Sequence, residues 1–182
     1  MKEVTAVTAL AIMNDKWVIS KNHENIFRVH DDREYFNRMT MGKIVVYGIN
    51  TLQTLPNAKP LANRTNIILT HDRDVRISGA ITVGSIKELE YVLKGYSTDD
   101  VYLIGGEKTF AELIDECKTA ILTVVNDDTD GDPEVFQHFP NLKLRDNWMS
   151  CKESSEHYYQ GLRWTRKTYV NTRFRKHLKS RL

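Results

Sequence analysis

The 182-residue sequence has few of the features that mark disulfide-rich, membrane-spanning or multidomain proteins. Its two cysteines, Cys117 and Cys151, lie far apart and belong to no metal-binding motif, so we expect neither a disulfide framework nor a zinc site, and we expect a reducing, cytoplasmic location. No apolar run reaches the roughly 20 residues that cross a bilayer. With four prolines, nine glycines and no linker rich in either, the sequence predicts one main domain.

The sequence also lacks the common catalytic and phosphate-binding motifs. There is no GxSxG elbow for a serine nucleophile, no GxGxxG fingerprint and no P-loop with its lysine and hydroxyl residue. A pair of glycosidase-like carboxylates is not identifiable either. The chemistry must therefore come from a less obvious set of residues.

Positive charge is concentrated near the C-terminus. The net charge is +2, but the segment from Arg163 onward carries eight Lys or Arg and no acid, which leaves −6 for the residues before it. We divide the chain into a domain of residues 1–171 and a basic tail of residues 172–182. The tail could contact nucleic acid, but a solvated tail is the preferred interpretation, because basic tails are common and unspecific.

Short apolar runs alternate with helical patterns along the chain. The runs predict strands, and the nearly continuous first run is typical of a strand covered on both faces and not of a signal peptide. Strands alternating with helices imply right-handed crossovers. We predict a three-layer α/β fold with a doubly wound, mostly parallel central sheet of about eight strands and an antiparallel C-terminal strand. The predicted strands are 4–12, 43–49, 65–70, 80–83, 101–104, 119–125 and 161–170, and the predicted helices are 31–39, 50–55, 85–95 and one that follows residue 106.

A glycine pair, Gly105-Gly106, separates the apolar run 101–104 from the helix that follows it. Glycine lets the backbone approach a ligand closely, and a helix N-terminus favours an anion. The same pair can equally be a simple tight turn. The pair alone leaves both interpretations open.

Four other residues could form a site, each with a plain structural alternative. Asp32 precedes Phe36 by four residues, so both can lie on one helix face, where an aromatic wall would desolvate the carboxylate and raise its pKa. Helix capping is the alternative for this acid and the preferred one for Asp31. Arg64 could bind a carboxylate or be a surface arginine. The Thr123 hydroxyl, inside an apolar strand, could face a helix or a ligand.

The order of these features resembles the dihydrofolate reductase family over residues 4–170. The stretches that carry the resemblance are "VTALAI" leading through "WVIS" to "DDREYF", then "VVYGINTLQTLP", "PLANRTNIILT", "VYLIGGEKTF", "ILTVV" and "DGDPEVFQHFP". Each is degenerate, but together and in this order they are specific. The resemblance implies an NADPH-dependent oxidoreductase that reduces 7,8-dihydrofolate to tetrahydrofolate, by hydride transfer to C6 and protonation of N5.

The resemblance also implies the substrate residues. Asp32 would be the catalytic residue and the single ionisable group of an apolar pocket, hydrogen-bonded to the pterin ring and connected to Thr123. Phe36 would pack on the aromatic parts of folate, and Arg64 would pair with the glutamate α-carboxylate. The full substrate-binding set comprises Val7, Thr8, Asp32, Phe36, Leu55, Arg64, Ile104 and Thr123.

For the cofactor NADPH, the resemblance implies a nicotinamide end, a pyrophosphate cradle and a 2′-phosphate region. Ala9 and Ile19 would contact the nicotinamide through their backbones, and the glycine pair, joined in the family by a cis peptide, would make room for the cofactor. Lys108, Thr70 and His71 match the 2′-phosphate region. The full set comprises Ala9, Ile19, Ser20, Gly48, Ile49, Asn50, Thr51, Leu69, Thr70, His71, Gly105, Gly106, Glu107, Lys108 and Thr109.

Several positions depart from the family pattern. Ser20 replaces a glycine of the mobile loop, Ile26-Phe27 replaces Pro-Trp, Ile49 replaces a basic residue, and the loop before residue 18 is longer. Two alternatives therefore stay open: a non-catalytic ligand-binding or assembly protein on the same fold, and a pyrimidine reductase of the riboflavin pathway, whose members generally lack the acid at Asp32. The expected partners are dihydrofolate and NADPH. We expect no association with a membrane, and we expect a monomer or a weak dimer.

Overall fold

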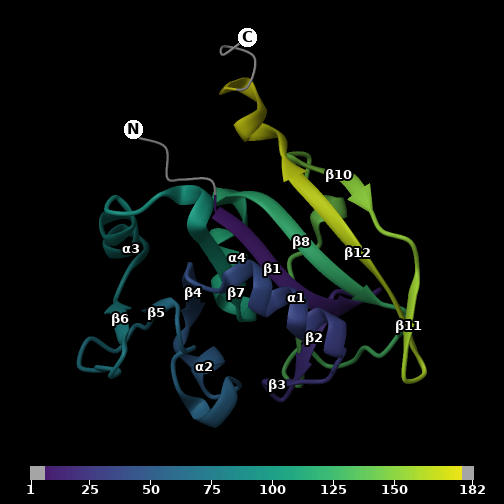
Figure 1. Cartoon of the computed structure of the whole chain (residues 1–182), viewed down its shortest axis with the longest axis horizontal. Coiled ribbons are helices and arrows are strands. Elements are labelled where there is room, and N and C mark those ends of the chain that lie inside the picture. The colour runs from purple at the N-terminus through teal and green to yellow at the C-terminus, as the bar shows by residue number, and fades with distance from the viewer. Residues whose placement is uncertain (1–6, 178–182) are drawn as a thin grey trace.

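The computed structural model describes residues 7–177 and has an α/β architecture (Figure 1). Its main sheet contains β1 (Val7–Asn14), β4 (Ile44–Gly48), β5 (Thr65–Leu69), β6 (Ala80–Val83), β7 (Val101–Gly105), β8 (Cys117–Val125), β10 (Trp148–Glu153), β11 (His157–Tyr159) and β12 (Leu162–Asn171). A small second sheet contains β2 (Val18–Lys21), β3 (Glu24–Asn25) and β9 (Phe136–His138). The α-helices are α1 (His30–Thr40), α2 (Ile49–Leu52), α3 (Ile86–Leu93) and α4 (Glu107–Leu113). Short 3₁₀ turns are η1 (Pro56–Ala58), η2 (Thr98–Asp100), η3 (Ile114–Glu116), η4 (Leu142–Leu144) and η5 (Thr172–His177).

The main sheet is wound in both directions from β1. Its order is β10-β12-β8-β1-β7-β4-β5-β6, and β11 pairs with β12. The pairs from β8 to β6 are parallel, whereas β12 runs antiparallel to β8 and to β10. The predicted fold class, a doubly wound and mostly parallel sheet finished by an antiparallel C-terminal strand, is confirmed.

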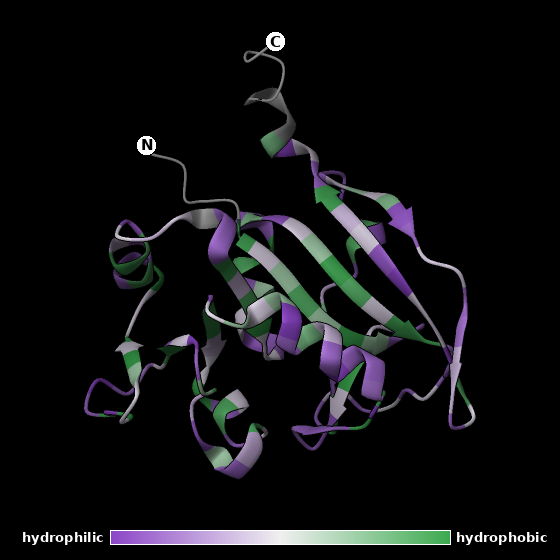
Figure 2. Ribbon diagram, viewed as in Figure 1, coloured by the Kyte–Doolittle hydropathy of each residue, from purple (hydrophilic) through white to green (hydrophobic). Residues whose placement is uncertain are grey.

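The sheet separates two apolar layers because successive strand residues face opposite sides. In β4, Val46 packs with α3 and α4, whereas Val45 and Tyr47 pack with α1 and α2. Figure 2 shows hydrophobic residues along the central strands and hydrophilic residues on the outward side of α1. These layers place α1 and its acids against one face of β1 and β8, with α4 behind the sheet (Figure 1).

The first strand reaches two residues further toward the C-terminus than the sequence pattern predicts. Residues 4–6 of the predicted strand lie outside the described residues, and β1 continues past residue 12 to Asn14. The Asn14 side chain is buried but satisfied: its oxygen accepts from the backbone N–H groups of Lys16 and Val18, and its nitrogen donates to the Thr129 carbonyl. A buried polar group with all its partners costs little, so Asn14 is accommodated as the last residue of the strand.

Helix α3 begins as the sequence predicts. Ser85 is its N-cap, and the Ser85 hydroxyl accepts a hydrogen bond from the Glu88 backbone N–H. The Glu88 carboxylate reaches back to the N–H of Gly84, one residue before the expected partner. No helix within residues 7–177 has both the length and the apolarity to span a membrane.

Asp115 connects η3 to the turn before β10. Its carboxylate accepts hydrogen bonds from Arg145 (2.6 Å), Asn147 (3.1 Å) and the Trp148 indole (3.3 Å). Burial by itself raises the pKa of Asp115, but these hydrogen bonds and the Arg145 charge outweigh burial and leave the pKa below its usual value. The folded protein therefore binds a proton at this site less readily than the unfolded chain does.

Replacing Asp115 with alanine is expected to lower the free energy of unfolding by about 1–3 kcal/mol near neutral pH, because several donors lose their acceptor. The contribution of the carboxylate is present above its unfolded pKa of about 4 and is lost as pH falls through the lower folded pKa. The wild type should thus lose more stability than the variant as pH falls below about 4. Urea unfolding across this pH range tests the expectation, and parallel curves for the two proteins would contradict it.

The predicted basic tail begins with η5, and residues 178–182 lie outside the described residues. In Figure 1, η5 leaves the end of β12 and points away from the sheet.

Candidate active site

Asp32, in the first turn of α1, faces the C-terminal half of β8 and the middle of β12. The Thr123 hydroxyl donates a short hydrogen bond to the Asp32 carboxylate, and both side chains are largely buried. Burial raises the pKa of Asp32, and the smaller opposing effects of the Thr123 hydrogen bond and the Arg166 charge leave it above its ordinary value. A carboxyl of this kind can exchange a proton nearer to neutral pH than an exposed aspartate.

Arg166 is a second ionisable group in this pocket, and the expectation of a single one is wrong. Its Nη2 lies 3.8 Å from the Asp32 carboxylate, and its side chain is 19% exposed. Sequence reasoning missed it because the residues from Arg163 onward were treated as one basic segment. The alternation of strand residues could have shown that Arg166 and Lys167 face opposite sides of the sheet.

An apolar wall lies beside the acid on the same face of the sheet. Phe36, one turn after Asp32, joins the cluster that contains Leu55 and Ile104, so the structure brings these three predicted substrate residues together. Leu10 of β1 belongs to the same cluster and was not predicted. Because Ile104 immediately precedes the glycine pair, the wall connects the acid to the end of β7.

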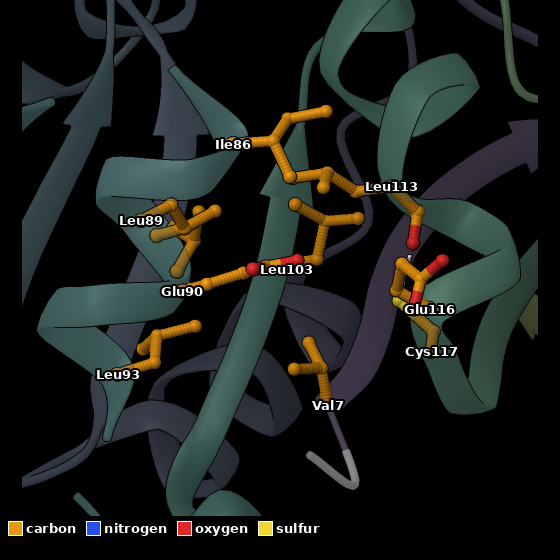
Figure 3. A pocket seen from close by; sticks show the side chains of 10 residues that line it. Val7, Ile86, Leu89, Glu90, Leu93, Leu103, Leu113, Glu116 and Cys117 are labelled. Carbon is orange, nitrogen blue, oxygen red and sulfur yellow. Dashed lines mark hydrogen bonds between the residues drawn. The ribbon is translucent and has the colours of Figure 1, made fainter. Parts of the chain in front are cut away.

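Val7, Thr8 and Ala9 do not reach this site. In the β1–β8 register, Ile12 lies opposite Thr123, whereas Val7 lies opposite Cys117. The side chain of Val7 points away from α1, into a cavity of about 30 Å³ on the other face of the sheet. Figure 3 shows this cavity between the leucines of α3 and the end of α4, with Cys117 at its edge.

The predicted positions of Thr8 and Ala9 are wrong for the same reason, a shift in the register of β1. Thr8 lies opposite Thr119 and Ala9 opposite Ala120, four and three residues before Thr123. The extra residues before Val18 were all assigned to a longer loop, but Met13 and Asn14 belong to β1 and only Asp15–Trp17 form the turn. The residues that stand in their place beside Thr123 and the end of β7 are Leu10, Ala11 and Ile12.

Arg64 lies at the start of β5 and contacts the C-terminal end of α1. Its guanidinium donates to the Thr40 hydroxyl (3.1 Å), the Ala62 carbonyl (2.8 Å) and the Asn37 side chain (2.8 Å). These bonds hold the planar group between the end of α1 and the start of β5. A guanidinium fixed in this way is preorganised to receive a carboxylate.

The glycine pair and the start of α2 meet at the carboxyl ends of the central strands. The Gly105–Gly106 peptide is cis, and Gly105 has φ +120°. A Cβ on Gly48 would lie 2.5 Å from the Thr109 hydroxyl, and a Cβ on Gly106 would lie 3.1 Å from the Thr51 hydroxyl. The two helix starts therefore approach so closely that glycine is required.

The remaining predicted cofactor residues surround these helix starts. Ile49 and Asn50 open α2, and Glu107, Lys108 and Thr109 open α4. Leu69, Thr70 and His71 follow at the end of β5, where Leu69 and Thr70 are buried and His71 is exposed. Their position matches the edge of the sheet where ligands bind in doubly wound folds.

The Glu107 side chain has a structural partner. Its carboxylate accepts a hydrogen bond from the His138 backbone N–H at 2.9 Å, and this bond joins α4 to the small sheet.

Ile19 and Ser20 lie in β2 of the small sheet. The Ser20 hydroxyl donates to Gln137 at 3.0 Å, and Gln137 also accepts from the His23 backbone N–H. Asn22 and His23 both have positive φ, which makes a tight turn between β2 and β3. The segment predicted as a mobile loop is thus tied to β9 through β2 and through His23 in this turn.

Comparisons with known proteins agree with this architecture. The family model described as dihydrofolate reductase matches residues 6–171. The dihydrofolate reductase of Bacillus subtilis is 25% identical over 167 residues, which is 88% of this chain and 95% of the relative. That of Staphylococcus aureus is 29% identical over 115 residues, 63% of this chain and 68% of the relative.

Among solved structures, dihydrofolate reductase from Enterococcus faecalis, complexed with NADP(H) and RAB-propyl, is similar in fold. The TM-score is 0.78 at 24% identity, with 91% of this chain and 95% of the other covered. The family match spans α1 with Asp32, the turn before β5 with Arg64, β8 with Thr123, and the glycine pair. The chain belongs to the dihydrofolate reductase family.

Proposed function

We propose that this protein is an active dihydrofolate reductase, which reduces 7,8-dihydrofolate to 5,6,7,8-tetrahydrofolate with NADPH. The observation that carries the proposal is the buried Asp32–Thr123 pair, which lies beside the apolar cluster of Phe36 and Ile104, the latter directly before the glycine pair. When bound, NADPH supplies the hydride that is transferred to C6 of the substrate. The residues of the chain bind and orient the two rings and exclude water.

The residues at the helix starts fit a dinucleotide diphosphate. Gly48 is the N-cap of α2 and Gly106 the N-cap of α4, and neither helix start has a side-chain cap hydrogen bond. Free backbone N–H groups at two adjacent helix starts favour an anion. The hydroxyl of Thr51, beside Gly106, would be a further hydrogen-bond donor to this diphosphate. Lys108 and His71, both exposed, would meet the 2′-phosphate.

Asp32 would hold the pterin ring through hydrogen bonds that the carboxylate accepts from the ring nitrogens. The negative charge raises the basicity of N5, and water delivers the proton to it. Thr123 orients the carboxylate. Phe36, Leu55, Ile104 and Leu10 would pack against the rings, and Arg64 would pair with the glutamate α-carboxylate.

For the nicotinamide, the corrected register favours the backbone of Ala11 and Ile12, together with Ile19. Ser20 would lie at the edge of this site. Monomeric or weakly dimeric protein in a reducing cytoplasm is part of the same proposal; both cysteines are free, and Cys117 is buried.

The assay mixes purified protein with dihydrofolate and NADPH and follows absorbance in the nicotinamide band. Turnover is expected with NADPH, and NADH in parallel tests whether Ile49 has changed cofactor preference. Binding of both ligands without turnover would favour the non-catalytic alternative. The family match and Asp32 argue against the riboflavin-pathway alternative, and a pyrimidine substrate in the same assay tests it directly.

A further inference from the structure

Arg166 lies directly beside the catalytic pair. In the sheet it is paired with Thr123, so its side chain crosses toward the same face as the Thr123 hydroxyl. The Arg166 Nε lies 3.4 Å from the Thr123 hydroxyl oxygen, and Nη2 lies 3.8 Å from the Asp32 carboxylate. Both charged side chains are 19% exposed, so solvent screens their interaction only partly.

Aromatic rings hold the guanidinium in place. Its central carbon lies 3.7 Å from the ring centre of Tyr35 on α1 and 5.0 Å from that of Trp164 on β12. Stacking on aromatic faces is favourable for arginine and leaves its N–H groups free for other partners. The Nη2 atom is buried and has no hydrogen-bond partner among residues 7–177. The cation is thus fixed by packing and directed at the acid.

We propose that Arg166 is a positioning residue for the reduction: it keeps Asp32 ionised in the closed pocket and makes the pocket unfavourable for cationic rings. The inference rests on the proposed function and deepens it. With Arg166 present, the buried pair carries no net charge, whereas a lone Asp32 would carry −1. A neutral pterin can then still donate hydrogen bonds to the ionised Asp32. A cationic ring is attracted much less strongly, because the charge of Arg166 offsets that of Asp32.

Two strands present groups to Asp32. Thr123 faces it from β8 and Arg166 from β12, while Tyr35 of α1 stacks on Arg166. Arg166 is the charged group that acts on the Asp32 pKa, in the direction that favours the carboxylate. A bound ligand would exclude more water, which disfavours the carboxylate further and makes the neighbouring cation more important.

Replacing Arg166 with methionine is expected to shift the alkaline limb of the pH–rate profile upward by about one pH unit. A positive charge lowers the proton affinity of every nearby base, so its removal raises the pKa of Asp32 and of substrate N5 alike. The direction of the shift is therefore the same whichever group controls the limb. Arg166→Lys keeps the charge and should keep the limb near its wild-type position.

Ligand binding provides a second readout that does not need turnover. The probe is a 2,4-diaminopyrimidine, whose protonated ring pairs with a carboxylate, titrated above neutral pH. Arg166→Met is expected to bind this cation roughly fivefold or more tightly than the wild type does, because a repulsive charge is gone. A variant that is merely misfolded or loosened would bind every ligand more weakly, so a gain separates the two explanations.

Lys167→Met is the matched control. Lys167 is the next residue of β12 and faces the other side of the sheet, where it pairs with Glu153 at 3.3 Å. This variant loses the same charge and should change neither the profile nor the affinity for the cation. Arg166→Gln replaces Arg166→Met if the latter does not fold.

An unshifted limb and an unchanged cation affinity in the uncharged Arg166 variant would overturn the inference. So would a shift of equal size in Lys167→Met or Arg166→Lys. A wild type without turnover would instead contradict the proposed function, and the cation titration would still decide the role of Arg166.

Discussion

Replacing Asp32 with asparagine is expected to lower turnover at neutral pH by at least ~100-fold while NADPH affinity stays unchanged. Asparagine has nearly the same shape but carries no charge, so it cannot raise the basicity of N5. Its amide also accepts fewer hydrogen bonds than the carboxylate. Steady-state kinetics with dihydrofolate, together with NADPH titration by fluorescence, separates the two effects.

Asp31→Asn is the control for this experiment. Asp31 is the preceding residue of the same helix turn, its side chain is 58% exposed, and its Oδ1 lies 3.8 Å from the His30 ring. Its removal also deletes one charge near the start of α1, but it should leave turnover within about twofold of the wild type, because exposed charges are screened. Normal turnover in Asp32→Asn would refute the catalytic role of this acid.

Replacing Arg64 with leucine is expected to raise KM for dihydrofolate about 10- to 100-fold with little change in NADPH affinity. The estimate follows from a net loss of about 1.5–3 kcal/mol, the value of one charge-assisted hydrogen bond. Arg64 also bonds to Thr40 and Asn37, so the melting temperature of the variant should be measured in parallel.

A substrate without the glutamate moiety is the control for Arg64. Wild type and Arg64→Leu should reduce a simple dihydropterin at similar rates, because the guanidinium has no carboxylate to bind there. An equal loss on both substrates would mean that Arg64 supports only the position of α1. Unchanged KM for dihydrofolate would contradict the substrate contact altogether.

The sequence predicted the fold well where local signals agree with the global pattern. Apolar runs identified the parallel strands, and Ser85 identified the start of α3. Asp32, Phe36 and Thr123 were recognised as neighbours because a helical spacing and a family pattern indicated the same face.

Two errors arose where the structure depends on pairing across the sheet. Asn14 interrupts the apolar run, but its buried hydrogen bonds keep it in β1 as the last residue. Val7, Thr8 and Ala9 therefore lie further from Thr123 than predicted. The position of Arg166 depends on how β12 aligns with β8, which no local pattern encodes. A polar side chain in a strand can be assigned to a face only when the register is known.

The separation of the site residues along the chain has a consequence for biosynthesis. Asp32 and Thr123 are 91 positions apart, and Arg166 follows Thr123 by another 43. A polypeptide emerging from the ribosome therefore exposes its acid long before the strand that carries the balancing cation has been made. Contacts between distant segments form slowly, so the acid and its balancing cation come together late in folding.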